Sequence, residues 1–158
     1  MTASPLASPE GSILTPNGWV TGKVEFAGHA ISAIDGRTTG RAKPNGPVVL
    51  PGFIDLHVHG GGGGDWRGGE DGVRTFVRYH TSCGTTVIAP TTTVGPVPVI
   101  EKSLSAITSI AEMRLPGEAV VLGAHLEGPF INPLKPGAME PSLILDGDAG
   151  LATSWAEK

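Results

Sequence analysis

The chain has 158 residues and a formal net charge of -4, and its 11 Lys and Arg residues are scattered, which argues against a nucleic-acid partner. A hydrophobic content of 39% is enough for one modest core. The single cysteine, Cys83, excludes an internal disulfide, and the sequence offers neither a signal peptide nor a stretch of membrane-spanning length. We therefore expect a cytoplasmic protein with no membrane partner.

The N-terminal third of the chain reads as a short tail followed by a small β unit. Residues 1–12 are rich in small residues and proline and are expected to be disordered. Short β-prone runs fill residues 13–48, with reversals expected at Asn17-Gly18 and Ala27-Gly28. This region is expected to fold separately from the rest.

From residue 49 to residue 158 the pattern changes to strands that alternate with helices. Such alternation indicates right-handed βαβ crossovers and a parallel sheet, and therefore an α/β fold. The expected elements are a strand at 49–59, a helix at 69–82, a strand at 84–90, a helix at 97–114 and a strand at 119–126.

Two histidines end the first of these strands, in PGFIDLHVHGGGGGDW. Side chains alternate between the faces of a strand, so His57 and His59 share a face with Asp55. An isolated His-x-His pair more often lies on a solvent-facing strand. The opposite face of the strand is aliphatic and is expected to pack against helices; it consists of Ile54, Leu56 and Val58. This aliphatic face and the five glycines after His59 favour a metal site over a solvent-facing strand.

The third strand repeats this arrangement in AVVLGAHLEGPF. His125 and Glu127 are expected on one face, and the aliphatic phase on the face that helices cover: Val120, Leu122, Ala124 and Leu126. A buried Glu127 without a partner would be costly, whereas opposite the two histidines it becomes a ligand of a divalent cation. His125 is then expected to orient a ligand or contact a substrate. A structural His–Glu pair is the alternative reading.

The threonines of Pro90–Pro96, PTTTVGP, follow the intervening strand. A loop at the carboxyl end of a strand is where α/β folds place ligands. Threonines are equally typical of turns and caps.

At these motifs the chain resembles a known family. PGFIDLHVHG resembles the first barrel strand of the amidohydrolase superfamily, and GAHLEGPFINPLKPGAM is similar to the third-strand motif of N-acetylglucosamine-6-phosphate deacetylases. HGGGGGDW and GTTVIAPTTT agree with that family, so the resemblance runs from about Gly18 to Pro141. The first motif is shared with dihydroorotase-like and hydantoinase-like enzymes, whereas HLEGPF is far more specific.

The resemblance implies a (β/α)8 TIM barrel, with its first three βα units in residues 49–158, preceded by part of a small β-sandwich domain in residues 13–48. It implies hydrolysis of the N-acetyl amide of N-acetylglucosamine 6-phosphate with one or two divalent metal ions, zinc or iron. By position, Glu127 matches the family's metal ligand, and His57 and His59 match a pair found in members that can hold a second metal.

The resemblance also implies a sugar contact at Ala138 and Met139, which align with a dipeptide of that role. The family usually has His where Met139 stands. A thioether cannot replace the hydrogen bonds of an imidazole, so we expect altered sugar recognition.

Length is the larger departure from the family. A full barrel needs roughly 250 residues, so the family's later histidines and catalytic aspartate are expected beyond Lys158, and no catalytic residue is assigned within this chain. We expect an N-terminal fragment, inactive alone, that forms a homo-oligomer or lacks a C-terminal half. The alternatives are a cyclic-amide hydrolase of the same superfamily, or a truncated or split-gene product.

Overall fold

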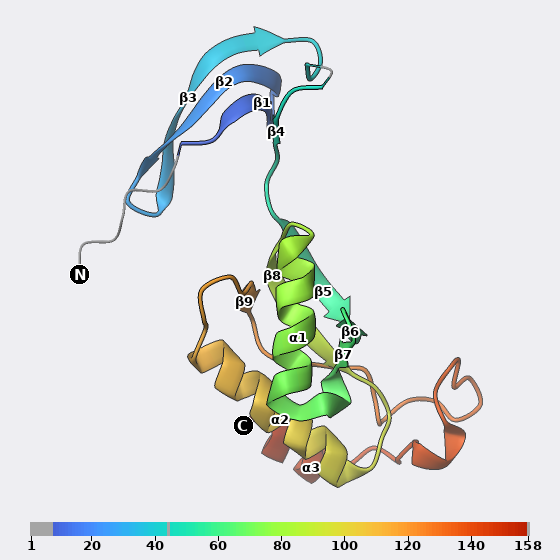
Figure 1. Ribbon diagram of the computed structural model, residues 1–158. Helices are drawn as coiled ribbons and strands as arrows, with labels where there is room; N and C mark the ends of the chain where they lie inside the picture. Colours follow the sequence, from blue (N-terminus) through green and yellow to red (C-terminus); the bar gives the residue numbers. More distant parts are fainter. Residues whose placement is uncertain (1–7, 44, 158) are drawn as a thin grey trace. The chain divides into compact units, whose positions relative to one another are not determined.

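The computed structural model describes residues 8–43 and 45–157, and the chain divides into two compact units, Met1–Pro51 and Gly52–Lys158 (Figure 1). The division falls after Pro51, later in the chain than the expected boundary at residue 48. The reason is that Val48 and Val49 pair with the first strand and so belong to the N-terminal unit.

The N-terminal unit is one sheet with the strand order β3-β2-β1-β4. The neighbours are antiparallel except for β1 and β4, which are parallel. Its strands are β1 (Glu10–Thr15), β2 (Gly18–Ala27), β3 (Ala30–Thr39) and β4 (Val48–Val49).

The expectation of a disordered tail through residue 12 is wrong for residues 10–12, which lie in β1. Ser12 explains why this stretch is ordered. Its amide donates to the carbonyl of Pro47, and its hydroxyl accepts from the amide of Lys43. Residues 1–7 of the expected tail lie outside the described residues.

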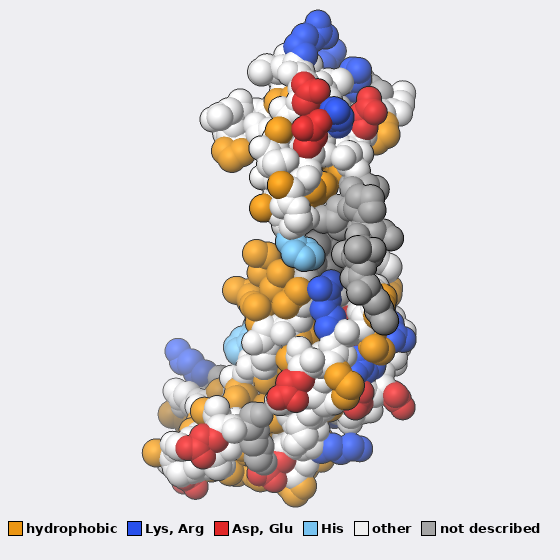
Figure 2. Space-filling model, turned by 90° about the vertical axis from the view of Figure 1, so that its left-hand side faces the viewer, with side chains coloured by type: hydrophobic (Ala, Val, Ile, Leu, Met, Phe, Trp, Pro, Cys, Tyr) orange, Lys and Arg blue, Asp and Glu red, His pale blue; other side chains and the backbone are white. Residues whose placement is uncertain are grey.

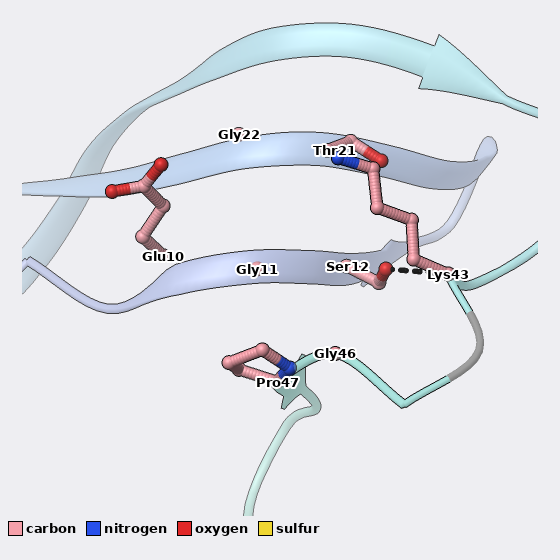
Figure 3. Close-up of a pocket in the computed structure, with 8 residues that line it drawn as sticks. All are labelled: Glu10, Gly11, Ser12, Thr21, Gly22, Lys43, Gly46 and Pro47. Carbon is pink, nitrogen blue, oxygen red and sulfur yellow. Dashed lines mark hydrogen bonds between the residues drawn. The ribbon is translucent and has the colours of Figure 1, made fainter.

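The sheet of this unit is only thinly covered. Ile13 and Val24 are its buried hydrophobic residues, whereas every residue of β3 but the last is exposed. A cavity of about 460 Å³ lies between β1, β2 and the segment before β4, lined by backbone and by the side chains of Glu10 and Lys43 among others (Figure 3). A second layer over this sheet, as in a sandwich, remains a prediction.

The larger unit contains a parallel sheet in which β8 is the central strand, with β5 on one side and both β9 and β10 on the other. Strands and helices alternate along the chain as expected. The elements are β5 (Phe53–Val58), α1 (Gly69–Ser82), β8 (Thr85–Thr92), α2 (Val97–Glu112), β9 (Val120–Val121) and β10 (His125–Leu126).

The helices α1 and α2 bury their apolar stripes against this sheet. Val73, Phe76 and Val77 of α1 recur at helical spacing and enter one core cluster with Val58 and Val121 of the strands. This α/β arrangement is confirmed, but the described strands form an open sheet and no closed barrel.

The third strand departs from the regular strand expected at 119–126. Gly123 has a φ of 134°, which interrupts the strand and changes which side chains face the helices. Before it, Val121 is buried while Val120 and Leu122 are exposed, so the predicted phase is wrong there. After it, Ala124 and Leu126 pack against the core clusters as expected.

The first strand is also less covered than expected. On the face expected to pack against helices, Val58 is buried, whereas the side chains of Ile54 and Leu56 are 65% and 57% exposed. No described element packs over these two side chains. Figure 2 shows hydrophobic side chains gathered in patches on the face that it presents.

A buried carboxylate joins α1 to the loop before β9. The side chain of Glu118 is 0% exposed. It accepts hydrogen bonds from Arg74 at 2.8 Å, from Arg78 at 3.1 Å and from the amide of Leu115 at 3.0 Å. Burial opposes ionisation of this carboxyl, but these donors outweigh it and hold the pKa of Glu118 below its ordinary value.

The remaining elements are short. The glycine run forms a hairpin of β6 (Gly60–Gly61) and β7 (Gly64–Asp65), and α3 (Ala149–Ala156) follows a long irregular segment that contains a 3-10 turn, Pro141–Leu143. Trp155 of α3 stacks on Phe130. Among the described residues, no helix combines the length and apolar character that crossing a membrane requires.

Candidate metal centre

Three of the predicted site residues meet where the parallel strands end. His57 is the penultimate residue of β5, His59 directly follows that strand, and Glu127 directly follows β10. The two Nε2 atoms are 3.1 Å apart, and Oε2 of Glu127 lies 3.3 Å from His57 Nε2 and 3.1 Å from His59 Nε2. The strand ends therefore bring two imidazoles and one carboxylate to a single point.

These separations fit a metal ion. Bonds of about 2.0–2.2 Å from zinc to nitrogen or oxygen place neighbouring ligand atoms about 2.8–3.6 Å apart, for angles between right-angled and tetrahedral. All three observed distances fall within that interval. The side chains of His57, His59 and Glu127 remain 52%, 40% and 35% exposed, so a fourth ligand can approach from solvent.

Backbone contacts hold the first strand end in place. Nδ1 of His59 lies 3.0 Å from the carbonyl of Thr91, and the amide of Trp66 donates to the carbonyl of His59. The amide of His57 donates to the carboxylate of Asp55. His80 of α1 lies 3.1 Å from the carbonyl of Gly60 and so fixes the start of the glycine hairpin.

His125 lies beside the cluster. Its ring centroid is 5.0 Å from that of His57, in an edge-on arrangement. Its Nδ1 lies 3.1 Å from the carbonyl of Leu56 and 3.3 Å from the hydroxyl of Thr91. His125 thus contacts a candidate ligand, and its role as an orienting group or a substrate contact stays a prediction.

The cluster opens into a cavity of about 680 Å³. Ala138 and Met139, the predicted sugar contacts, line it, and so do the cationic residues Arg67 and Lys135. The sequence analysis did not single out these two cations as site residues. The sequence signal that could have identified them is their position, Arg67 just after the glycine run and Lys135 just before Gly137-Ala138-Met139. The cavity therefore joins the metal-ligand cluster to a partly cationic wall.

Of the described carboxylates, Glu127 and Glu140 line this cavity, whereas Asp55 and Asp65 do not. Asp55 accepts from the amide of His57, Asp65 from the amide of Arg67, and Glu140 from the amide of Ser142. These contacts therefore assign none of the three carboxylates as a catalytic acid or base.

The comparisons with known proteins agree with one another. The model of the amidohydrolase family matches residues 48–155. The chain is 38% identical over 111 residues to the N-acetylglucosamine-6-phosphate deacetylase of Vibrio furnissii, covering 69% of this chain and 28% of that protein. It is 32% identical over 134 residues to the N-acetylgalactosamine-6-phosphate deacetylase of Escherichia coli O157:H7, covering 84% and 35%. The chain thus spans about a third of the length of these curated relatives.

Solved structures show the same likeness. The N-acetylglucosamine-6-phosphate deacetylase of Thermotoga maritima superposes with a TM-score of 0.75 at 28% identity, over 93% of this chain and 39% of that one. The corresponding enzyme of Mycobacterium smegmatis gives 0.74 at 24% identity, over 94% and 42%, which at this identity shows a shared fold.

Proposed function

Because this chain belongs to the amidohydrolase family, we propose that it is the N-terminal portion of a metal-dependent deacetylase. The proposed reaction hydrolyses the N-acetyl amide of N-acetylglucosamine 6-phosphate, giving glucosamine 6-phosphate and acetate. The deacetylases among its relatives support this substrate. In the same proposal the parallel sheet is the first part of a (β/α)8 barrel, the N-terminal unit is part of a β-sandwich, and the protein is cytoplasmic.

The cluster of three donor atoms is the observation that carries the proposal. His57, His59 and Glu127 would hold a zinc or iron ion, and a second ion is possible in the family. When bound, such an ion supplies Lewis acidity and makes a water molecule more acidic near neutral pH. The histidines and the glutamate keep the donor atoms converged at the cavity, while His125 orients His57 through its ring contact.

The cavity walls would take the sugar. Ala138 and Met139 line the same cavity as the ligand cluster, which supports a sugar contact there. The catalytic aspartate that this proposal requires would come from a C-terminal half, because further copies of this chain in a homo-oligomer would add no such residue. N-acetylgalactosamine 6-phosphate is a second candidate substrate, because the N-acetylgalactosamine-6-phosphate deacetylase of Escherichia coli O157:H7 matches 84% of this chain.

Zinc titration of the 158-residue chain tests the metal centre. We expect His57→Ala, His59→Ala and Glu127→Ala each to weaken zinc binding by more than about 100-fold, beyond what the loss of a ligand-orienting contact costs. His29→Ala, in the β2–β3 turn, serves as the control and is expected to bind as the parent does. Equal affinity in all four variants would exclude a metal at this cluster.

A chimera tests the reaction. This chain would replace the matching N-terminal part of the Thermotoga maritima enzyme, and acetate release would be measured with both N-acetylhexosamine 6-phosphates. We expect turnover that depends on Glu127. Hydrolysis of hydantoin or dihydroorotate, with no release of acetate, would instead support the cyclic-amide alternative. A chimera that folds and binds zinc but hydrolyses neither the N-acetylhexosamine 6-phosphates nor the cyclic amides would favour the alternative of an inactive truncated or split-gene product.

Met139→His in the same chimera is expected to lower KM for N-acetylglucosamine 6-phosphate by about fivefold, because a restored imidazole regains a hydrogen bond worth about 1 kcal/mol. Met139→Leu is the matched control, since it conserves size without adding a donor. The measurement is the comparison of kcat and KM for the three chains. Unchanged KM on introducing His would show that this side chain does not contact the sugar.

A further inference from the structure

Thr91 occupies the strand between the two that carry the candidate ligands. It is 0% exposed, and it lies on β8 directly opposite His125 of β10. On the other side its hydroxyl and carbonyl reach the end of β5. One buried residue therefore contacts both strand ends at which the donor atoms converge.

The carbonyl of Thr91 fixes the tautomer of His59. A carbonyl oxygen only accepts hydrogen bonds, so Nδ1 of His59, 3.0 Å away, must carry the proton. In a neutral imidazole the lone pair then resides on Nε2, which is the atom that faces Glu127. This contact therefore leaves His59 with its metal-binding atom directed into the cluster.

The hydroxyl of Thr91 fixes the backbone between the two histidines. It accepts from the amide of Val58 at 2.9 Å, and Val58 is the residue that separates His57 from His59. The hydroxyl hydrogen is available for the carbonyl of Ala89 at 3.0 Å. Nδ1 of His125 lies 3.3 Å from the same hydroxyl oxygen. Because this nitrogen also lies 3.1 Å from the carbonyl oxygen of Leu56, which only accepts hydrogen bonds, it acts as a donor.

From these contacts we infer that Thr91 is a positioning residue for the metal centre. It touches neither the metal nor the substrate; it holds His59 in the Nδ1–H tautomer and holds the His57–His59 backbone at the spacing that the cluster requires. The inference rests on the proposed function, because it assumes that the cluster binds a metal ion.

The test is a zinc titration of Thr91→Val in the 158-residue chain. Valine conserves the shape and keeps the carbonyl but removes the hydroxyl. We expect zinc affinity to fall about tenfold, at the low end of the range for lost ligand-orienting contacts. Thr91→Ser restores a hydroxyl and is expected to recover most of the affinity. Thermal unfolding of each variant identifies any that fails to fold.

Thr92→Val is the matched control. Thr92 is the next residue of β8 and is equally buried, but its hydroxyl has no hydrogen-bond partner among the described residues. Its replacement is expected to leave zinc affinity unchanged. Equal affinity in Thr91→Val and Thr92→Val, or a Thr91→Ser variant as weak as Thr91→Val, would overturn the inference.

A second readout needs no metal. Nitrogen-15 NMR of the metal-free chain, at a pH where the imidazoles are neutral, is expected to show His59 mainly as the Nδ1–H tautomer, with its resonances shifted in Thr91→Val and unshifted in Thr92→Val. A parent chain with His59 as Nε2–H would contradict the role of Thr91. A parent chain with the expected tautomer but no zinc binding would contradict the proposed metal centre instead.

Discussion

Replacement of Glu118 by alanine is expected to lower the free energy of unfolding by about 3 kcal/mol, the low end of the range for removing one partner of a buried ion pair. The low end applies because Arg74 keeps its second partner, Glu70, and Arg78 is about half exposed. Urea unfolding of the two chains measures the difference. Glu70→Gln, which weakens the i,i+4 pair with Arg74 and an exposed 3.4 Å contact with Ser109, is the control and is expected to cost about 0.5 kcal/mol or less.

The same carboxylate predicts how stability depends on pH. Its donors hold the pKa of Glu118 in the folded chain below its ordinary value of 4.5. Stabilisation by this group is therefore fully present above the ordinary value and is lost as the pH falls below it, towards the folded pKa. Glu118→Gln removes the ionisation, so its stability is expected to fall less steeply in that acid range than that of the parent. Parallel acid profiles for parent and variant would show that Glu118 does not carry the effect.

The sequence predicts the helices of the larger unit better than its strands. Helix α1 occupies the expected residues 69–82 because Val73, Phe76 and Val77 fall on one stripe between a glycine-rich start and the turn at Gly84. The predicted phase of the third strand is wrong only before Gly123, because the positive φ of this residue breaks the alternation between Val120 and Leu122 on one side and Ala124 and Leu126 on the other. Alternation indicates which residues share a face only while the strand stays regular.

The candidate ligands were predictable because they are close to short, regular strand ends. His57 and His59 are two residues apart, and Glu127 follows the same kind of pattern on the third strand. The role of Thr91 was not predictable, since it depends on contacts with residues 32 to 34 positions away. Likewise, strand periodicity assigns Ile54 and Leu56 to one face of β5, but it does not show whether a helix covers that face. In the structure both side chains are exposed.

The isolated 158-residue chain is expected to release no measurable acetate from N-acetylglucosamine 6-phosphate, even with zinc bound. Apart from the candidate ligand Glu127, Glu140 is the one described carboxylate that lines the cavity, and its Oε1 accepts from the amide and the hydroxyl of Ser142. Loss of a general acid–base group typically lowers a rate by about 10² to 10⁴. The measurement is acetate release by this chain beside the chimera, with a Glu127→Ala chimera as the background control.

The same chain is also expected to self-associate. The central strand β8 is paired on both sides, so the unpaired backbone edges belong to β5 and to β9 and β10. Beside the β5 edge lie the exposed side chains of Phe53, Ile54 and Leu56. Unpaired strand edges with apolar neighbours favour association, which size-exclusion chromatography detects.

The double substitution Ile54→Lys with Leu56→Lys is expected to shift the elution towards the monomer, whereas Leu134→Lys, an exposed loop control, is not. A monodisperse monomer with turnover would refute both expectations, because it would mean that the open sheet needs no partner and that a residue of this chain supplies the proton transfer.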